Sequence, residues 1–153
     1  MTLTRHTMVV QLTPAELWKG LINKAEDPVP YLPEITACTV LERYPNGLLR
    51  EIQVRNGKRQ RELATFEPMR RITFAQLTDP LLAEIVNEIG TDQVGRTTFT
   101  LYVTLSPAGL ERAAREPGFS AKIDEFFGGT VGQIVETLHR HAAVLAAATA
   151  ADD

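Results

Sequence analysis

Four polar side chains share the parity of apolar neighbours in segments that the sequence predicts to be β-strands. They are Arg50, Glu62, Gln76 and Asn87. Every second residue of a strand points to the same face, so these side chains would lie on an apolar wall. A polar group buried there costs about 2–7 kcal/mol unless it finds a hydrogen-bonding partner. These residues are therefore candidates for orienting a carbonyl or hydroxyl group of a bound molecule.

The same four residues also have a structural interpretation. Arg50 and Glu62 can pair with each other near a cavity rim, while Gln76 and Asn87 can bind backbone groups or water. A register shift of one residue would turn the whole set outward, so the sequence leaves the orientation of Arg50 and Glu62 open. General acid catalysis by Glu62 is a further alternative, which would require its burial in an apolar pocket.

Other side chains give little support for catalysis or metal binding. His139 and His141 are two residues apart in a predicted helix, whereas a helical metal pair is spaced by three or four residues. Ser106 precedes a proline at a strand end, and Ser120 is a candidate helix N-cap, so neither indicates a nucleophile. We therefore predict no catalytic residue, no metal site and no cofactor.

Turn signals divide most of the chain into strands. Asn46-Gly47 and Asn56-Gly57 are typical hairpin turns, and Asp-Pro, Glu-Pro and Ser-Pro pairs separate the later segments. The connections are too short for parallel crossovers, so the six segments after residue 34 form an antiparallel meander. The predicted strands are 4–12, 35–44, 48–54, 59–66, 71–77, 82–89 and 96–105.

Two long helices complete the pattern. Thr13-Pro14-Ala15-Glu16 has the sequence of a capping box, and prolines between residues 28 and 33 end the helix that follows. A second helical stripe runs from about Phe119 toward Ala150 and would be about 40 Å long. Glycines 128, 129 and 132 indicate a kink in it, or a close approach of the sheet or of a ligand. A shorter helix is expected near residues 110–115.

This order predicts an α+β fold in which a curved antiparallel sheet of about seven strands wraps around the long C-terminal helix. The space between sheet and helix would be a container lined by inward-facing side chains. We predict the following ligand-contacting residues: Phe74, Gln76, Ile85, Asn87, Phe99, Leu101, Phe127, Val131 and Ile134.

Composition restricts the class of protein further. A chain of 153 residues fits one domain over residues 1–153, with an alanine-rich tail that frays from about residue 147. The net charge of −3 gives no indication of nucleic-acid binding. No apolar run approaches the ~20 residues of a membrane span, and nothing resembles a signal peptide. The single cysteine, Cys38, fits a reducing compartment, so we expect a cytoplasmic location.

Several stretches resemble one protein family. They are Leu17 to Pro28, Tyr31 to Thr36, Phe66-Glu67-Pro68 with Ile72-Thr73-Phe74, and Val135 to Leu138. They resemble the AtaL-like group, formerly a domain of unknown function, within the START-like, birch-pollen-allergen-like helix-grip superfamily. The resemblance covers about Thr2 to Ala146. It implies a hydrophobic cavity used for ligand binding, transport or cyclisation chemistry, and it brings no catalytic residues with it.

Three functions follow as alternatives. The first is a binding module that encloses a hydrophobic small molecule or lipid. The second is a cyclase- or dehydratase-type enzyme acting on a polyketide-like substrate in the same cavity, with Glu62 or Arg50 assisting proton movement. The third is a protein-interaction module with a filled core and an exposed apolar patch. The sequence does not decide whether a reaction is catalysed, and it leaves the oligomeric state open, a homodimer included.

Overall fold

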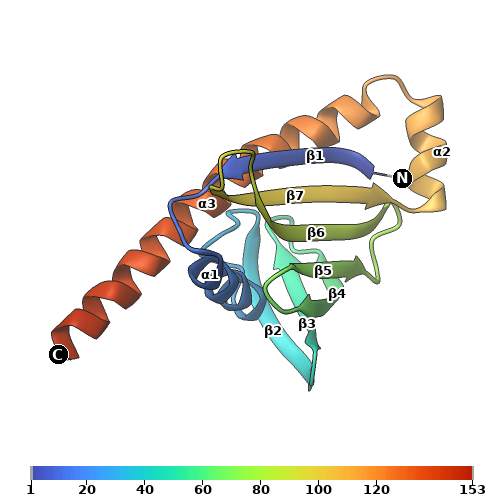
Figure 1. Ribbon diagram of the computed structural model, residues 1–153. Helices are drawn as coiled ribbons and strands as arrows, with labels where there is room; N and C mark the ends of the chain where they lie inside the picture. The colour runs from blue at the N-terminus through green and yellow to red at the C-terminus, as the bar shows by residue number, and fades with distance from the viewer. Residues whose placement is uncertain (1, 153) are drawn as a thin grey trace.

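The computed structural model places one antiparallel sheet against a long C-terminal helix, with two shorter helices beside them (Figure 1). The structure describes the backbone of residues 2–152 and the side chains of residues 3–149. The helices are α1 (Pro14–Glu26), α2 (Pro107–Arg115) and α3 (Phe119–Asp152). The strands are β1 (Thr2–Val9), β2 (Ile35–Tyr44), β3 (Gly47–Val54), β4 (Arg59–Glu67), β5 (Arg71–Gln76), β6 (Leu82–Thr91) and β7 (Thr97–Leu105).

The strand order in the sheet is β1-β7-β6-β5-β4-β3-β2. Strands β2 to β7 form the predicted meander, in which each strand pairs with its neighbour in sequence. β1 pairs antiparallel with β7, so the first and last strands lie side by side. The fold class predicted from the sequence is confirmed, with a sheet of seven strands.

Helix α1 begins at the predicted capping box. The Thr13 hydroxyl accepts a hydrogen bond from the Glu16 backbone N–H, and the Glu16 carboxylate accepts one from the Thr13 N–H. Its buried face meets α3 at Gly20, where a Cβ atom would lie 2.5 Å from the Leu138 side chain. The absence of a side chain at Gly20 therefore allows the two helices to cross closely.

Helix α3 follows Gly118, whose φ of 87° lies in the left-handed region that glycine tolerates. Its inner stripe is buried from Phe127 to Leu138 and packs on the sheet and on α1. Beyond Leu138 the helix leaves the sheet and projects away from it (Figure 1), and the Val144 side chain is 66% exposed. Fraying of the tail from about residue 147 stays a prediction.

Two local predictions were wrong. The first strand ends at Val9 and not at residue 12, because residues 11–13 bend toward the cap of α1. Ser120 is not the N-cap of α3, since the helix already begins at Phe119. The short helix expected near residues 110–115 is confirmed and begins earlier, at Pro107, capped by Ser106.

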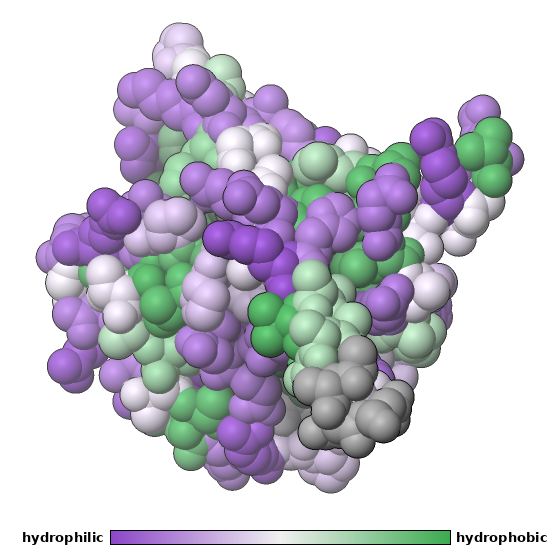
Figure 2. Space-filling model, turned by 90° about the vertical axis from the view of Figure 1, so that its left-hand side faces the viewer, coloured by the Kyte–Doolittle hydropathy of each residue, from purple (hydrophilic) through white to green (hydrophobic). Residues whose placement is uncertain are grey.

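Figure 2 shows the side of the molecule toward which α3 projects. On this face apolar residues occur in small separate areas between hydrophilic ones. Within residues 2–152, no helix combines the length and apolar character that crossing a membrane requires.

Candidate functional site

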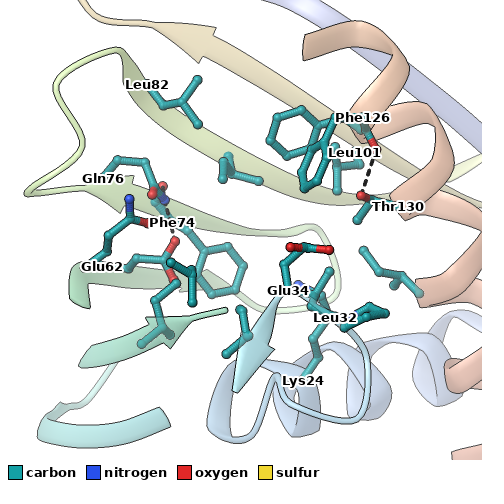
Figure 3. Close-up of a pocket in the computed structure, with 18 of the residues that line it drawn as sticks. Lys24, Leu32, Glu34, Glu62, Phe74, Gln76, Leu82, Leu101, Phe126 and Thr130 are labelled. Carbon is teal, nitrogen blue, oxygen red and sulfur yellow. Dashed lines mark hydrogen bonds between the residues drawn. The ribbon is translucent and has the colours of Figure 1, made fainter. Parts of the chain in front are cut away.

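A cavity of about 390 Å³ lies between the inner face of the sheet, the end of α1 and the N-terminal half of α3 (Figure 3). Its volume falls toward the lower end of the range of about 300–1,000 Å³ that is typical of small-molecule pockets. Its lining residues come from α1, the segment before β2, strands β2 to β7, the connection between β5 and β6, and α3.

The cavity has a buried inner end and an exposed mouth. At the inner end Phe74, Leu101 and Ile134 form an apolar wall, each at most 2% exposed. At the mouth, Glu34 and Phe126 are exposed lining residues that come from opposite sides (Figure 3). Access from solvent is therefore between the segment before β2 and α3.

Adjacent glycines of α3 have different surroundings. A Cβ atom at Gly128 would lie 3.0 Å from the His6 ring on β1, so this glycine permits close packing of helix and sheet. Gly129 lines the cavity, and a Cβ atom there would meet nothing within 4 Å. The close approach of the sheet that the glycines indicated is thus found at Gly128, while the approach of a ligand, for which Gly129 leaves room, stays a prediction.

Arg50, Glu62 and Gln76 form one hydrogen-bonded row across three strands. Arg50 faces Glu62 in the register of β3 and β4, and Glu62 faces Gln76 in that of β4 and β5. Arg50 donates to Glu62 Oε1 through Nε over 2.9 Å, and its Nη2 lies 2.7 Å from the same oxygen. Gln76 donates to Glu62 Oε2 over 2.6 Å. Both carboxylate oxygens of Glu62 thus act as acceptors.

Arg50 also holds the end of α1. Its Nη1 donates to the carbonyl oxygens of Lys24 and Ala25 over 3.3 and 2.9 Å. The last carbonyl groups of a helix lack partners within the helix and carry partial negative charge, so a cation is favourable there. The sheet and α1 are therefore joined beneath the cavity by one buried guanidinium.

Lys24 reaches the cavity from the last turn of α1. Its Nζ donates to Asn87 Oδ1 over 2.9 Å and lies 4.9 Å from the centre of the Phe74 ring. The Arg50 guanidinium lies 4.4 Å from the centre of the same ring. We call Lys24, Arg50, Glu62, Gln76 and Asn87 the buried polar cluster. It contains two basic groups and one carboxylate, which Arg50 and Gln76 already engage.

This environment disfavours the charged form of Lys24. Burial and, to a smaller extent, the positive charge of Arg50 lower the pKa of its amino group to about 7, against the opposing effect of the Glu62 carboxylate. Because desolvation penalises an ammonium more than a neutral amine, a substantial fraction of Lys24 is neutral near pH 7. A neutral amine in an apolar cavity is both a base and a nucleophile.

The structure brings most of the predicted ligand-contacting residues to the cavity. Six line it: Phe74, Gln76, Ile85, Leu101, Phe127 and Ile134. The other three, Asn87, Phe99 and Val131, are buried in the core and are not among its lining residues. Asn87 accepts a hydrogen bond from Lys24 but does not itself line the cavity. The contact of any of these residues with a ligand stays a prediction.

Arg50 and Glu62, whose orientation the sequence left open, both face the cavity and pair with each other. Lys24 was missed. Its spacing was a usable signal, since Lys24 follows Leu17 by seven residues and Leu21 by three, on the apolar stripe of α1. A charged residue on such a stripe either extends to solvent or is buried with a partner.

Two of the three histidines, His6 and His139, occupy structural positions. His6 Nε2 lies 3.0 Å from Asp124 Oδ1 and ties β1 to α3, with Thr4 in the same contact. His139 Nε2 accepts a hydrogen bond from the Gln11 backbone N–H. Among the residues that the structure describes, no group of three His, Cys, Asp or Glu side chains is placed to hold a metal ion.

Solved structures of low sequence identity have the same helix-grip fold. The Zhui aromatase/cyclase from Streptomyces sp. R1128 has a TM-score of 0.63 at 15% identity, over 90% of this chain and 93% of that one. Ara h 8.0201 has a TM-score of 0.60 at 14% identity, over 92% of this chain and 98% of that one. At these identities the similarity establishes the fold alone.

A third neighbour is larger than this chain. The di-domain ARO/CYC BexL from the BE-7585A biosynthetic pathway has a TM-score of 0.59 at 15% identity over 90% of this chain. The chain spans 48% of BexL, about half its length. Among curated proteins, none matches the sequence.

The sequence itself identifies the family. Residues 4–139 match the AtaL family, described as acetylaranotin biosynthesis cluster protein L. The chain therefore belongs to the AtaL family, as its resemblance indicated.

Proposed function

We propose that the protein binds a compact apolar small molecule in the cavity, with a polar group of that molecule directed toward the buried polar cluster. One observation carries the proposal: an apolar cavity of about 390 Å³ has Lys24 at its buried inner end. Pockets that bind small molecules combine apolar walls with a few placed polar groups, and this cavity has that composition. Its modest volume favours a compact ring system over a long-chain lipid.

A pair of glycine variants tests binding at this site. Gly129→Phe places a ring on the cavity wall, whereas Gly132→Phe places one on the same helix outside the lining, also where a Cβ atom meets nothing within 4 Å. We expect Gly129→Phe to weaken the binding of 2-naphthaldehyde by about tenfold or more, a change of about 1.4 kcal/mol. Isothermal titration calorimetry measures it. Equal affinities of the two variants would contradict binding in this cavity.

A cyclase or dehydratase acting on a polyketide-like substrate is the second candidate. The observation in its favour is Lys24, a group able to accept a proton inside an apolar cavity. Glu62 fits this role less well, because both of its oxygens already accept hydrogen bonds. The names of the neighbours Zhui and BexL, an aromatase/cyclase and a di-domain ARO/CYC, agree with this candidate.

The third alternative, a protein-interaction module, requires a filled core, and the presence of the cavity is evidence against it. A homodimer and a cytoplasmic location stay predictions from the sequence. Native mass spectrometry of freshly purified protein, followed by solvent extraction, would identify a co-purifying ligand and report the oligomeric state together.

A further inference from the structure

We propose that Lys24 forms a reversible imine with the carbonyl group of an apolar ligand held in the cavity. The inference rests on the proposed function, because the ligand must first occupy the cavity. Three features of the site carry it: Lys24 lines the cavity, it is only 3% exposed, and its Nζ lies beside the apolar ring of Phe74. Figure 3 shows Lys24 beneath Leu32 and Glu34, on the side of the cavity formed by α1.

The charges around Lys24 favour a reactive amine. The charged groups that face it are Arg50 from β3 and Glu62 from β4, and the carboxylate is engaged by Arg50 and Gln76. An ammonium at Lys24 would therefore be an excess buried charge, and the pKa of about 7 follows from this. A fully solvated lysine, with a pKa near 10.4, is neutral in only about one molecule in 10³ at pH 7. The chain has three other lysines, 19, 58 and 122, and all are exposed.

The reaction balances without a further reagent. The Nζ lone pair of neutral Lys24 attacks the carbonyl carbon, a C–N bond forms, and one amine proton passes to the oxygen to give a carbinolamine. The C–O bond then breaks, and the oxygen leaves as water with the second amine proton. The products are a C=N bond at Lys24 and one water molecule, which the mouth of the cavity can release to solvent.

Asn87 can form a hydrogen bond with the Lys24 nitrogen both when it is an amine and when it is an imine. Its Oδ1 accepts a hydrogen bond from Lys24 Nζ, while its Nδ2 is buried without a partner among the residues that the structure describes. An imine nitrogen has no proton to donate and needs a donor instead. If the side-chain amide of Asn87 rotates by about 180°, Nδ2 takes the place of Oδ1 beside that nitrogen and donates a hydrogen bond to it. Asn87 is thus a positioning residue for Lys24.

Reductive trapping tests the inference. The protein is incubated near pH 7 with 2-naphthaldehyde and sodium cyanoborohydride, and labelled sites are located by peptide mapping. We expect Lys24 to be labelled at least about tenfold faster than lysines 19, 58 and 122, because its neutral fraction is larger. The rate at Lys24 should follow a single ionisation and reach half of its maximum near pH 7.

Two variants separate chemistry from packing. Lys24→Met should lose the labelling of residue 24, while the exposed lysines 19, 58 and 122 keep their wild-type labelling rates. Binding of naphthalene, an analogue without a carbonyl group, to the wild-type protein reports occupancy of the cavity without imine formation. Asn87→Asp keeps Lys24 but places a carboxylate beside it, which favours the ammonium. In that variant the labelling of Lys24 near pH 7 should fall at least about fivefold, and its pH profile should move upward. A role for Asn87 in packing alone would not move that profile.

The failure of this inference is distinguishable from that of the proposed function. If wild-type protein binds naphthalene and only its exposed lysines are labelled, imine formation at Lys24 is wrong and binding stands. If wild-type protein binds neither naphthalene nor 2-naphthaldehyde, the proposed function is wrong as well. Labelling of Lys24 with the same pH profile in wild type and Asn87→Asp would overturn the positioning role of Asn87.

Discussion

At the inner end of the cavity the polar side chains are buried and hydrogen-bonded to one another, whereas at the mouth the side chains are exposed to solvent. Arg50 and Glu62 are 2% and 3% exposed, and Phe126 is 51% exposed. The inner end is linked to α1 and to three strands, so its geometry depends on the whole fold. The mouth is formed by side chains on one face of α3 and on the segment before β2. We infer that the inner end determines which ligand is bound, and that the mouth determines how fast the ligand enters and leaves.

Glu62→Gln is expected to have the largest effect on the inner end. It leaves the buried Arg50 cation without a counter-charge, so the free energy of unfolding should fall by about 3–5 kcal/mol. Urea denaturation measures this change. The matched control is Glu51→Gln on the outward face of β3, where the carboxylate lies 3.2 Å from Arg61. A surface pair contributes about 0–1 kcal/mol, so comparable losses in the two variants would contradict a special role for the buried pair.

Lys24→Met should show its effect in the pH dependence of stability. The pKa of Lys24 is about 7 in the folded protein and near 10.4 in an unfolded chain. Between these values the unfolded state binds more protons, so the wild type gains stability as the pH rises. From pH 7 to pH 10 its free energy of unfolding should rise by about 3–4 kcal/mol relative to that of Lys24→Met.

Near pH 7, accordingly, the methionine variant should be the more stable protein. Urea denaturation measures the free energy of unfolding of both proteins across this pH range. In the difference between the two values, the contributions of the other titrating groups cancel, because both proteins contain those groups. A difference that does not change with pH would mean that Lys24 keeps its charge in the folded state, and the inner end would then hold a permanent ammonium.

Phe126→Ala is expected to have the smallest effect on stability, within about 0.5 kcal/mol, because the ring is half exposed. Its main effect should be on the rates at which a ligand binds and is released. The association and dissociation rate constants for naphthalene should both rise, by about threefold, with little change in affinity. Stopped-flow fluorescence measures both constants. Val144→Ala, an exposed position of α3 outside the lining, is the control and should change neither.

Much of the fold could be predicted because strands and helices impose different periods on apolar residues. The alternation around Phe99 and Leu101 identified the buried face of β7, and the capping box at Thr13 located the start of α1. Parity also placed Gln76 on the cavity side, while it left the orientation of Arg50 and Glu62 open. The end of β1 and the N-cap of α3 were less accurate, since both depend on backbone hydrogen bonds that side-chain patterns do not report.

The site itself was only partly predictable, because parity tells which face a residue occupies and not how deep it lies. Phe99 and Val131 are on the inward faces and yet pack in the core, away from the cavity. Lys24 was missed because a lysine is ordinarily a surface residue. Its burial depends on Asn87 and Arg50, which are distant in sequence and come near it only when α1 closes on the sheet.

The helix above the cavity is supported at two points. Gly128 rests on the His6 ring, and ten residues further on Leu138 lies in the space left by Gly20. At 1.5 Å per residue these supports are about 15 Å apart, and Thr130, Gln133 and Ile134 of the cavity wall lie between them. Packing contacts therefore hold this span of α3 at both of its ends, whereas Phe126 lies before the first contact, outside the held span. A molecule entering the cavity is therefore expected to displace the Phe126 ring, while the part of α3 between Gly128 and Leu138 stays in place.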